Sequence, residues 1–541
     1  MLFNSLEYLL FFPSVFALYW LLNGHRSAQN LLILLSSYFF YGWWDVRFLY
    51  LIAFTTVFDF NAAQLIENRH VSWLSRLKSV GFITIAYAGF VLPESWQQGT
   101  WTEGGSSGLI ATVLLSALVL AGPRLVSSIP ERLQRKVIVS LTVIVNLTIL
   151  GFFKYFNFFV DSFQAMYLTV FGVEPSIIML SIVLPVGISF YTFQSMSYTI
   201  DVYRREMKST PSIVEFGAYL SFFPQLVAGP IERGKNLLPQ FQRDRVWNAD
   251  EAREGLWLIA WGLFKKVVIA DNLSILVNSV FGAYDQGETS ALPAGGGLLT
   301  LIAVYAFAFQ IYADFSAYSD IARGCAKLMG FDLMLNFRLP YIATNPSDFW
   351  QRWHVSLSSW LRDYLYIPLG GNRKGKFNTY RNLWLTMLLG GLWHGANWTF
   401  VLWGFYQGMI LVLYRLLGID HAGAKSTGLM KAIHVLWFFQ LTCLGWLIFR
   451  AQNLDTIWIF LASIFGDFRG SVEASEAGWT LISFIWPLLL VQALQIRFQS
   501  FYVLPRFHWF ANLNIWLLIL LSIGVFASNQ FRPAEFIYFA F

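Results

Sequence analysis

His394 is the residue best suited to do chemistry, because it places an imidazole inside an apolar run between residues 383 and 413. It stands in the segment Gly390-Gly391-Leu-Trp-His394-Gly-Ala-Asn397-Trp. An ionisable side chain at membrane depth is costly and therefore indicates a function. Imidazole accepts a proton near neutral pH, and desolvation would keep it in the neutral form that a base needs. The alternative is a structural histidine that is hydrogen-bonded between helices.

A second histidine, His354, lies within a regular pattern of apolar residues. Asn345-Pro-Ser-Asp is a helix-start signal, and apolar residues then recur at a spacing of three to four. These residues are Trp350, Trp353, Leu357, Trp360 and Leu361, whereas Arg352, Ser356, Ser359 and Arg362 fall off their face. The pattern predicts an amphipathic helix at the cytoplasmic interface. His354 would lie at the edge of the tryptophan face, as an interfacial residue or as a second polar group that reaches the same cavity.

Three charged residues have two interpretations each. Asp314 could bind a substrate or orient a base, or it could cap a helix end or pair with Arg323. Arg352 and Arg362 could bind the phosphates of an anionic donor, because a planar guanidinium binds phosphate oxygens in pairs. They could equally meet lipid headgroups.

Several other kinds of site lack their sequence signatures. The chain contains no Gly-x-x-x-x-Gly-Lys-Ser/Thr phosphate loop, no Gly-x-Ser-x-Gly nucleophile and no His-Glu-x-x-His zinc pair. Its two cysteines, Cys325 and Cys443, match no metal or disulfide spacing. We therefore expect no metal site. A hydroxyl that is deprotonated by a histidine and attacks directly fits the residues that are present.

The elements that must position these residues are membrane helices. Of the 541 residues, 56% are hydrophobic and 13% are charged, and the mean hydropathy is +0.53. A soluble domain carries about 25% charged residues. The apolar runs are long and do not alternate, which favours helices over a barrel. We expect an all-α polytopic membrane protein that forms a single domain over residues 1–541. Its net charge of +6 reflects basic loops and does not indicate nucleic-acid binding.

The charge of the loops predicts the orientation. Every second loop in the first third of the chain is basic, so those loops would face the cytoplasm and the N-terminus would lie outside. The first run lacks the features of a cleaved signal peptide and is expected to be a retained helix. The run 214–230 contains Pro224, Gly229 and Pro230 and lies between two basic loops. It is predicted to be a re-entrant segment next to a cavity on the cytoplasmic side.

Five motifs resemble the membrane-bound O-acyltransferase family, and within it the bacterial branch that contains the alginate O-acetylation membrane protein. They are Pro224–Pro230, Tyr312-Ala-Asp314-Phe-Ser-Ala-Tyr-Ser-Asp320, Asp348-Phe-Trp-Gln-Arg-Trp-His354-Val-Ser-Leu-Ser, Arg362-Asp363-Tyr-Leu-Tyr-Ile-Pro-Leu-Gly-Gly-Asn372-Arg and Gly391-Leu-Trp-His394-Gly-Ala-Asn397-Trp. The resemblance implies a ring of tilted helices with re-entrant segments around a central tunnel. It places the catalytic core at about 214–418.

The resemblance also implies roles for individual residues. His394 matches the presumed catalytic histidine of the family, and His354 matches its second important histidine. Substrate or donor binding would fall to other motif residues, namely Asp314, Arg352, Trp353, Arg362, Asp363, Trp393 and Asn397. The bacterial branch takes its acyl group from a cytoplasmic donor, acetyl-CoA in the acetylating members, and holds no permanent cofactor. It often passes the group to a periplasmic acetyltransferase partner that acts on a polymer.

The function expected from this resemblance is acetyl transfer across the bacterial inner membrane onto an extracellular or periplasmic polysaccharide such as alginate. Peptidoglycan and cellulose are alternative acceptors. A transporter or channel for a polysaccharide or lipid intermediate is a rival from another class. A third interpretation is a haem held by the two histidines within the helical bundle.

Overall fold

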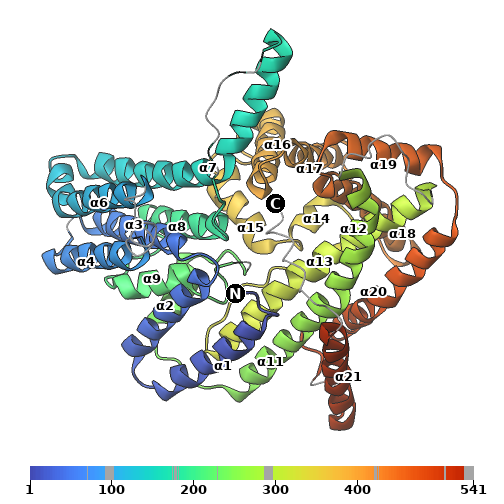
Figure 1. Ribbon diagram of the computed structural model, residues 1–541, viewed down its shortest axis with the longest axis horizontal. Helices are drawn as coiled ribbons and strands as arrows, with labels where there is room; N and C mark the ends of the chain where they lie inside the picture. Colours follow the sequence, from blue (N-terminus) through green and yellow to red (C-terminus); the bar gives the residue numbers. More distant parts are fainter. Residues whose placement is uncertain are drawn as a thin grey trace. The chain divides into compact units, whose positions relative to one another are not determined.

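The structure is a computed structural model that describes residues 1–69, 71–91, 103–173, 175, 180, 182–227, 229–285, 296–419, 423, 426–504 and 507–528. The regular elements in these ranges are all helices (Figure 1). Eight of the described helical segments are long and apolar enough to cross a membrane. They are Val46–Asn68 (η1 and α3), Gly105–Ser127 in α6, α7 (Glu131–Phe171), α13 (Gly296–Leu328), α17 (Trp398–Leu416), α18 (Gly428–Arg450), α20 (Val472–Phe498) and Trp509–Ala527 in α21. The predicted all-α polytopic class is confirmed.

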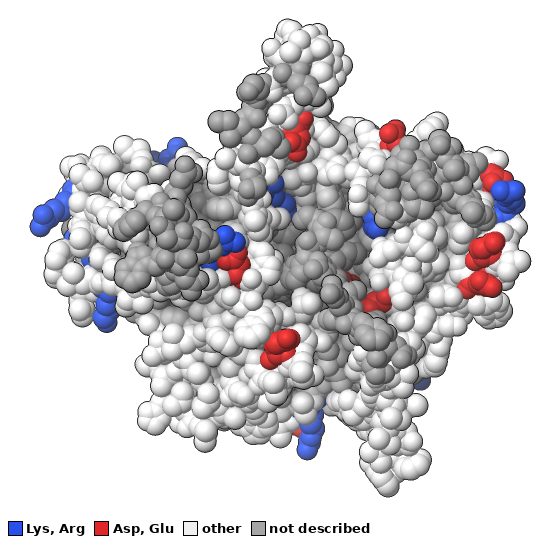
Figure 2. Space-filling model, in the orientation of Figure 1, with Lys and Arg blue, Asp and Glu red and all other residues white. Residues whose placement is uncertain are grey.

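The exterior is apolar, as expected of a surface that faces lipid. Large hydrophobic side chains are widely exposed, among them Leu518 on α21 (Trp509–Ser528) and Trp479 on α20. Charged residues are sparse on the face shown in Figure 2. The most apolar window of α21 is only 6% buried within the protein. Lipid hydrocarbon can contact such side chains without a free-energy penalty, whereas their exposure to water would be unfavourable.

Contacts along the chain divide it into two compact units. The first unit comprises Met1–Ala252 and Cys325–Leu333. Its described helices include α1 (Leu6–Leu21), α2 (Arg26–Gly42), α3 (Leu49–Asn68), α4 (Trp73–Phe90), α6 (Glu103–Ser127), α7, α8 (Ile188–Tyr203), α9 (Ile213–Ser221) and α10 (Gly234–Gln242). Helix α3 forms the centre of this unit and packs against α4, α7, α8 and α9. Its buried Asp59 accepts hydrogen bonds from Asn146 on α7 and Ser195 on α8.

Helix α9 is too short to cross a membrane. Its nine residues extend about 14 Å at a rise of about 1.5 Å per residue. The chain leaves the helix at Phe222, and both Phe222 and Phe223 are completely buried. The re-entrant path predicted for residues 214–230 stays a prediction.

The second unit comprises Arg253–Gly324 and Met334–Phe541. It begins with α11 (Ala249–Phe264), which continues through a π-helical turn, η2 (Lys265–Ala270), into α12 (Asp271–Asp285). Helices α13 to α21 follow, including η3 (Pro340–Ile342), α14 (Pro346–Trp350), α15 (Val355–Leu361), η4 (Arg362–Tyr366), α16 (Gly375–His394) and α19 (Leu454–Gly466).

The single amphipathic helix predicted around His354 is wrong in one respect, because two short helices replace it. Helix α14 ends at Trp350, and His354 adopts a left-handed backbone with φ of 44° before α15 begins. Backbone groups of residues 352 and 355 form hydrogen bonds with the segment 336–338 instead of continuing the helix. The Arg338 N–H donates to the Arg352 carbonyl at 2.9 Å, and the Val355 N–H donates to the Asn336 carbonyl at 2.9 Å. Spacing alone cannot show such tertiary competition.

Candidate functional site

His394 is the last residue of α16, at the tip of a tightly packed helical hairpin. Helices α16 and α17 run antiparallel, and glycines let their backbones approach closely. A Cβ added at Gly391 would lie 2.3 Å from the Phe400 carbonyl oxygen, and one added at Gly404 would lie 2.6 Å from the Met387 carbonyl oxygen. The single apolar run expected over residues 383–413 is therefore two helices. Of the glycines near His394, Gly391 serves this backbone contact, whereas Gly395 faces the Phe400 ring.

Aromatic rings surround the His394 imidazole. The ring centroids of Trp393, Trp403 and Phe449 lie 5.1, 5.0 and 5.3 Å from its own, all in edge-on orientations. The side chain is buried, with 5% of its surface exposed. These rings and its burial leave the imidazole little contact with water.

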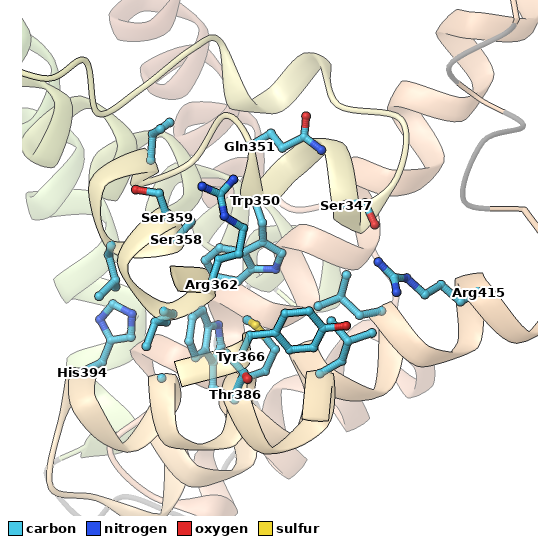
Figure 3. A pocket seen from close by; sticks show the side chains of 18 of the residues that line it. Ser347, Trp350, Gln351, Ser358, Ser359, Arg362, Tyr366, Thr386, His394 and Arg415 are labelled. Atoms are coloured by element: carbon cyan, nitrogen blue, oxygen red, sulfur yellow. The ribbon is translucent and has the colours of Figure 1, made fainter. Parts of the chain in front are cut away.

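A cavity of about 350 Å³ leads to His394. Its walls come from α14, α15, η4, α16 and α17 and are mainly apolar, with Leu357, Leu361 and Met387 near the histidine. Figure 3 shows His394 at one end of this cavity and Arg415 at the other. A volume of this size lies within the range of small-molecule sites.

The end of the cavity at Arg415 is polar and opens into further space. Ser347, Gln351, Asn372 and Arg415 line both this cavity and a second one of about 620 Å³. The second cavity adds Lys376 and Tyr380, among others. The two cavities together form one groove with an apolar inner end and a basic, hydrogen-bonding outer end.

Arg415 lies at the outer end of the groove, where its side chain also contacts the Tyr366 hydroxyl. Its Nε atom is buried and has no hydrogen-bond partner among the residues that the structure describes. It also forms no ion pair with any described residue. A buried guanidinium N–H without a partner is costly, and an anionic ligand would satisfy it. No motif in the sequence marks this residue.

The two arginines predicted to bind the donor are already paired within the chain. Arg362 lines the cavity, and its Nε contacts Asp363 at 2.7 Å. Arg352 does not line the cavity, and its Nε contacts Asp348 at 2.6 Å. Asp363 thus holds Arg362 at the wall of the cavity.

His354 is completely buried near Trp393 and does not line the cavity. The centroid of the Trp393 ring lies 6.2 Å from that of His354 and 5.1 Å from that of His394. Phe315 packs edge-on against His354 at 4.7 Å. Burial lowers the pKa of His354 to about 3, so its imidazole is neutral at physiological pH. The hairpin therefore brings together His394, Trp393 and His354.

Other predicted residues lie apart from the cavity or have a structural contact. Trp353 packs among aromatic rings, including Tyr341 and Trp446. Asn397 caps the start of α17, where its side chain accepts from the Thr399 N–H and donates to the Gln452 carbonyl. Neither residue lines the described cavity.

Asp314 belongs to a buried ionic cluster of the second unit. It lies 2.9 Å from the Lys266 ammonium group, which also contacts Asp271 at 2.9 Å. The Arg323 partner considered for Asp314 instead lies 3.7 Å from Asp320. Substrate binding by Asp314 stays a prediction.

Known proteins share this sequence over most of its length. Residues 138–454 match the family model described as MBOAT, membrane-bound O-acyltransferase family. The chain is 39% identical to the probable alginate O-acetylase AlgI of Azotobacter vinelandii, over 93% of this chain and 86% of that protein. It is 40% identical to the protein of the same description from Pseudomonas aeruginosa, over 88% and 76%. It is 31% identical to a peptidoglycan O-acetyltransferase of Helicobacter pylori, over 86% and 80%.

The matched range contains both histidines, the glycine-packed hairpin and the groove. The resemblance expected from the sequence motifs is confirmed over a much longer stretch than those motifs cover. The chain belongs to the membrane-bound O-acyltransferase family.

Proposed function

We propose that this membrane acyltransferase transfers an acetyl group from acetyl-CoA to a hydroxyl of an exopolysaccharide, with alginate as the acceptor. The observation that carries the proposal is a groove with His394 at its apolar inner end and, at its outer end, an arginine whose buried Nε has no hydrogen-bond partner among the described residues. The similarity to two proteins described as probable alginate O-acetylases supports the choice of polymer.

The groove suits a long donor that has an anionic part and a reactive end. Arg415 and Lys376 lie where the phosphates of acetyl-CoA would bind, and Asn372 and Gln351 add hydrogen-bonding groups. The apolar walls between Leu357 and Met387 would take the pantetheine arm. This arrangement presents the thioester at His394, with binding energy supplied far from the reacting carbon.

His394 acts as the general base of the proposed reaction. The acceptor oxygen attacks the thioester carbonyl carbon while His394 takes the hydroxyl proton. The C–S bond then breaks, and His394 returns the proton to the departing thiolate. General base catalysis contributes about 10²- to 10⁴-fold to a rate. His354 orients the acceptor from its own side of Trp393, so that donor and acceptor meet at the tip of the hairpin.

The topology proposed for the chain follows from its loops. We propose that the donor side faces the cytoplasm of a bacterial inner membrane and that the N-terminus lies outside, which the positions of the basic loops support. The two units would work as one membrane domain with the catalytic core at residues 214–418. The acetyl group would then reach the polymer through a periplasmic acetyltransferase partner or directly.

Replacement of His394 by alanine in cells that make the polymer tests the proposal. With His394→Ala as the only copy, the polymer is expected to be secreted without acetyl groups. His434→Ala serves as the control, because His434 is only half-buried and lies outside the groove. Immunoblotting should show equal amounts of both variants in the membrane. Polymer that stays fully acetylated would remove His394 from the mechanism. Polymer that is no longer secreted would favour the transporter.

A further inference from the structure

Asn336 clamps the segment that carries His354. Its backbone carbonyl accepts from the Val355 N–H at 2.9 Å. Its side-chain Oδ1 accepts from the Ser356 N–H at 3.2 Å and from the Ser356 hydroxyl at 2.7 Å, and it lies 3.3 Å from His354 Nδ1. Its Nδ2 donates to the Ser319 hydroxyl at 3.1 Å. Asn336 is itself completely buried, so these contacts satisfy its amide.

These contacts fix which way the Asn336 amide faces. A backbone N–H can only donate, so the atom opposite the Ser356 N–H must be the amide oxygen. The same oxygen cannot donate a hydrogen bond, so the Ser356 hydroxyl must be the donor of the bond between them. Both polar neighbours of His354 Nδ1, Asn336 Oδ1 at 3.3 Å and Ser356 Oγ at 3.4 Å, are thus acceptors.

The proton of neutral His354 must then reside on Nδ1. A neutral imidazole has one N–H, so the other nitrogen, Nε2, carries the free lone pair. Nε2 is buried and has no hydrogen-bond partner among the residues that the structure describes. The left-handed backbone at His354 adds to the cost of this arrangement, and such strain collects at functional sites.

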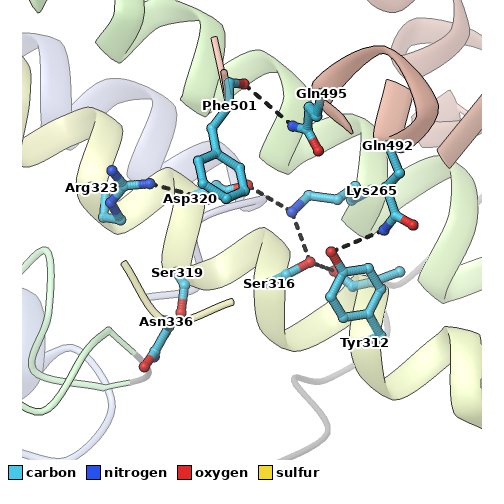
Figure 4. Close-up of polar contacts among 11 residues, drawn as sticks. Lys265, Tyr312, Ser316, Ser319, Asp320, Arg323, Asn336, Gln492, Gln495 and Phe501 are labelled. Carbon is cyan, nitrogen blue, oxygen red and sulfur yellow. Dashed lines mark hydrogen bonds and ion pairs between the residues drawn. The ribbon is translucent and has the colours of Figure 1, made fainter. Parts of the chain in front are cut away.

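The far side of the clamp is anchored by ionic contacts on α13. Ser319, which holds the Asn336 amide, is adjacent to Asp320. The Lys265 ammonium group lies 2.7 Å from Asp320 and 2.7 Å from the Ser316 hydroxyl (Figure 4). Lys265 is buried, and this contact fixes the turn of α13 that faces Asn336. The same helix carries Phe315, which packs on the His354 ring.

We propose that Asn336 is a positioning residue that locks His354 as the Nδ1–H tautomer, so that Nε2 is held ready to accept a hydrogen bond from the acceptor hydroxyl. The hydrogen bond from the acceptor hydroxyl rests on the proposed function. The tautomer assignment rests only on the contacts of Asn336 and Ser356. A histidine free in water favours the opposite tautomer only weakly, and one well-placed acceptor is enough to reverse that preference.

Magnetic resonance of the full-length protein in lipid nanodiscs tests the tautomer directly. With isotope-labelled histidine, the signal that disappears in His354→Gln identifies His354. The wild-type signal is expected to show a protonated Nδ1 and a bare Nε2 near neutral pH. Asn336→Leu should convert it to the Nε2–H form or to a mixture, whereas Asn61→Leu, which removes a buried asparagine of the first unit, should not. A wild-type signal with Nε2–H, or an Asn336→Leu signal unchanged from wild type, would overturn the lock.

Kinetics separate this inference from the proposed function. Asn336→Leu is expected to lower kcat about tenfold or more while KM for acetyl-CoA stays within about twofold, because the donor groove is untouched. Asn336→Asp keeps an acceptor at Nδ1 and should retain more activity than Asn336→Leu. If His354→Gln is fully active, the role of His354 in the reaction fails and the tautomer stands. If His354→Gln is inactive but Asn336→Leu matches wild type, the positioning role fails and the proposed function stands.

Discussion

Replacement of Gly391 by alanine should cost both stability and activity, because this glycine sets the distance between α16 and α17. An added Cβ would lie 2.3 Å from the Phe400 carbonyl oxygen and 2.8 Å from the Gly404 backbone. An ordinary contact needs about 3.5 Å, so the helices must part by roughly 1 Å. Overpacking of this kind costs about 1–3 kcal/mol in the free energy of unfolding. His394 lies one turn further on, and a 1 Å misplacement can lower a rate by about 10²-fold.

The assay compares Gly391→Ala with Gly81→Ala in lipid nanodiscs. Gly81 also lies within a helix, α4, but an added Cβ there meets nothing within 4 Å. Gly81→Ala should therefore be neutral or stabilising by up to about 1 kcal/mol. Thermal unfolding measures stability, and initial rates of acetyl transfer measure activity. A Gly391→Ala protein with the melting temperature and rate of Gly81→Ala would refute the argument that close backbone packing positions His394.

Three further outcomes are expected. Arg415→Met should raise KM for acetyl-CoA about 10- to 100-fold with little change in kcat, since a hydrogen bond to a charged group is worth roughly 1.5–3 kcal/mol; initial-rate kinetics measure this. The pKa of His354 is about 3 in the folded state and about 6.5 in the unfolded state. Between these pH values the unfolded state binds more protons, so the free energy of unfolding decreases as the pH is lowered. At pH 5.5 this loss is about 1.4 kcal/mol relative to pH 8; thermal unfolding should show it in wild type and in His434→Ala but not in His354→Gln. Lys266→Met should cost about 3–5 kcal/mol in unfolding free energy, because it leaves buried carboxylates unpaired, and adding Asp314→Asn should restore part of the stability.

Hydropathy and composition predict most of the membrane helices because long apolar runs have few alternatives in lipid. They do not predict how charges buried within the helices are paired. Lys265 and Lys266 interrupt the apolar pattern of α11 and α12, yet both are buried against carboxylates of the second unit. Asp271 is local, but the partners Asp314 and Asp320 lie on α13, and the local sequence does not contain them.

The residues of the candidate site likewise fall into those that the sequence reveals and those that only the fold reveals. His394 is found from the sequence because an ionisable residue in an apolar run is conspicuous, and it lies at the inner end of the cavity. Arg415 is missed because a basic residue at the end of a membrane helix is ordinary until its buried, unsatisfied Nε is seen. Asn336 is missed because its contacts with His354 and Ser356 arise only when two loops pair in the fold.

The central claim, that His394 is the base of acyl transfer, is tested most directly by single-turnover kinetics. The purified protein in nanodiscs would receive labelled acetyl-CoA and an oligosaccharide of the acceptor polymer, with the periplasmic partner added if transfer requires it. His394→Gln is expected to bind acetyl-CoA normally and to transfer the label at least about 10²-fold more slowly than wild type. A His394→Gln protein that transfers the label at the wild-type rate would contradict the claim.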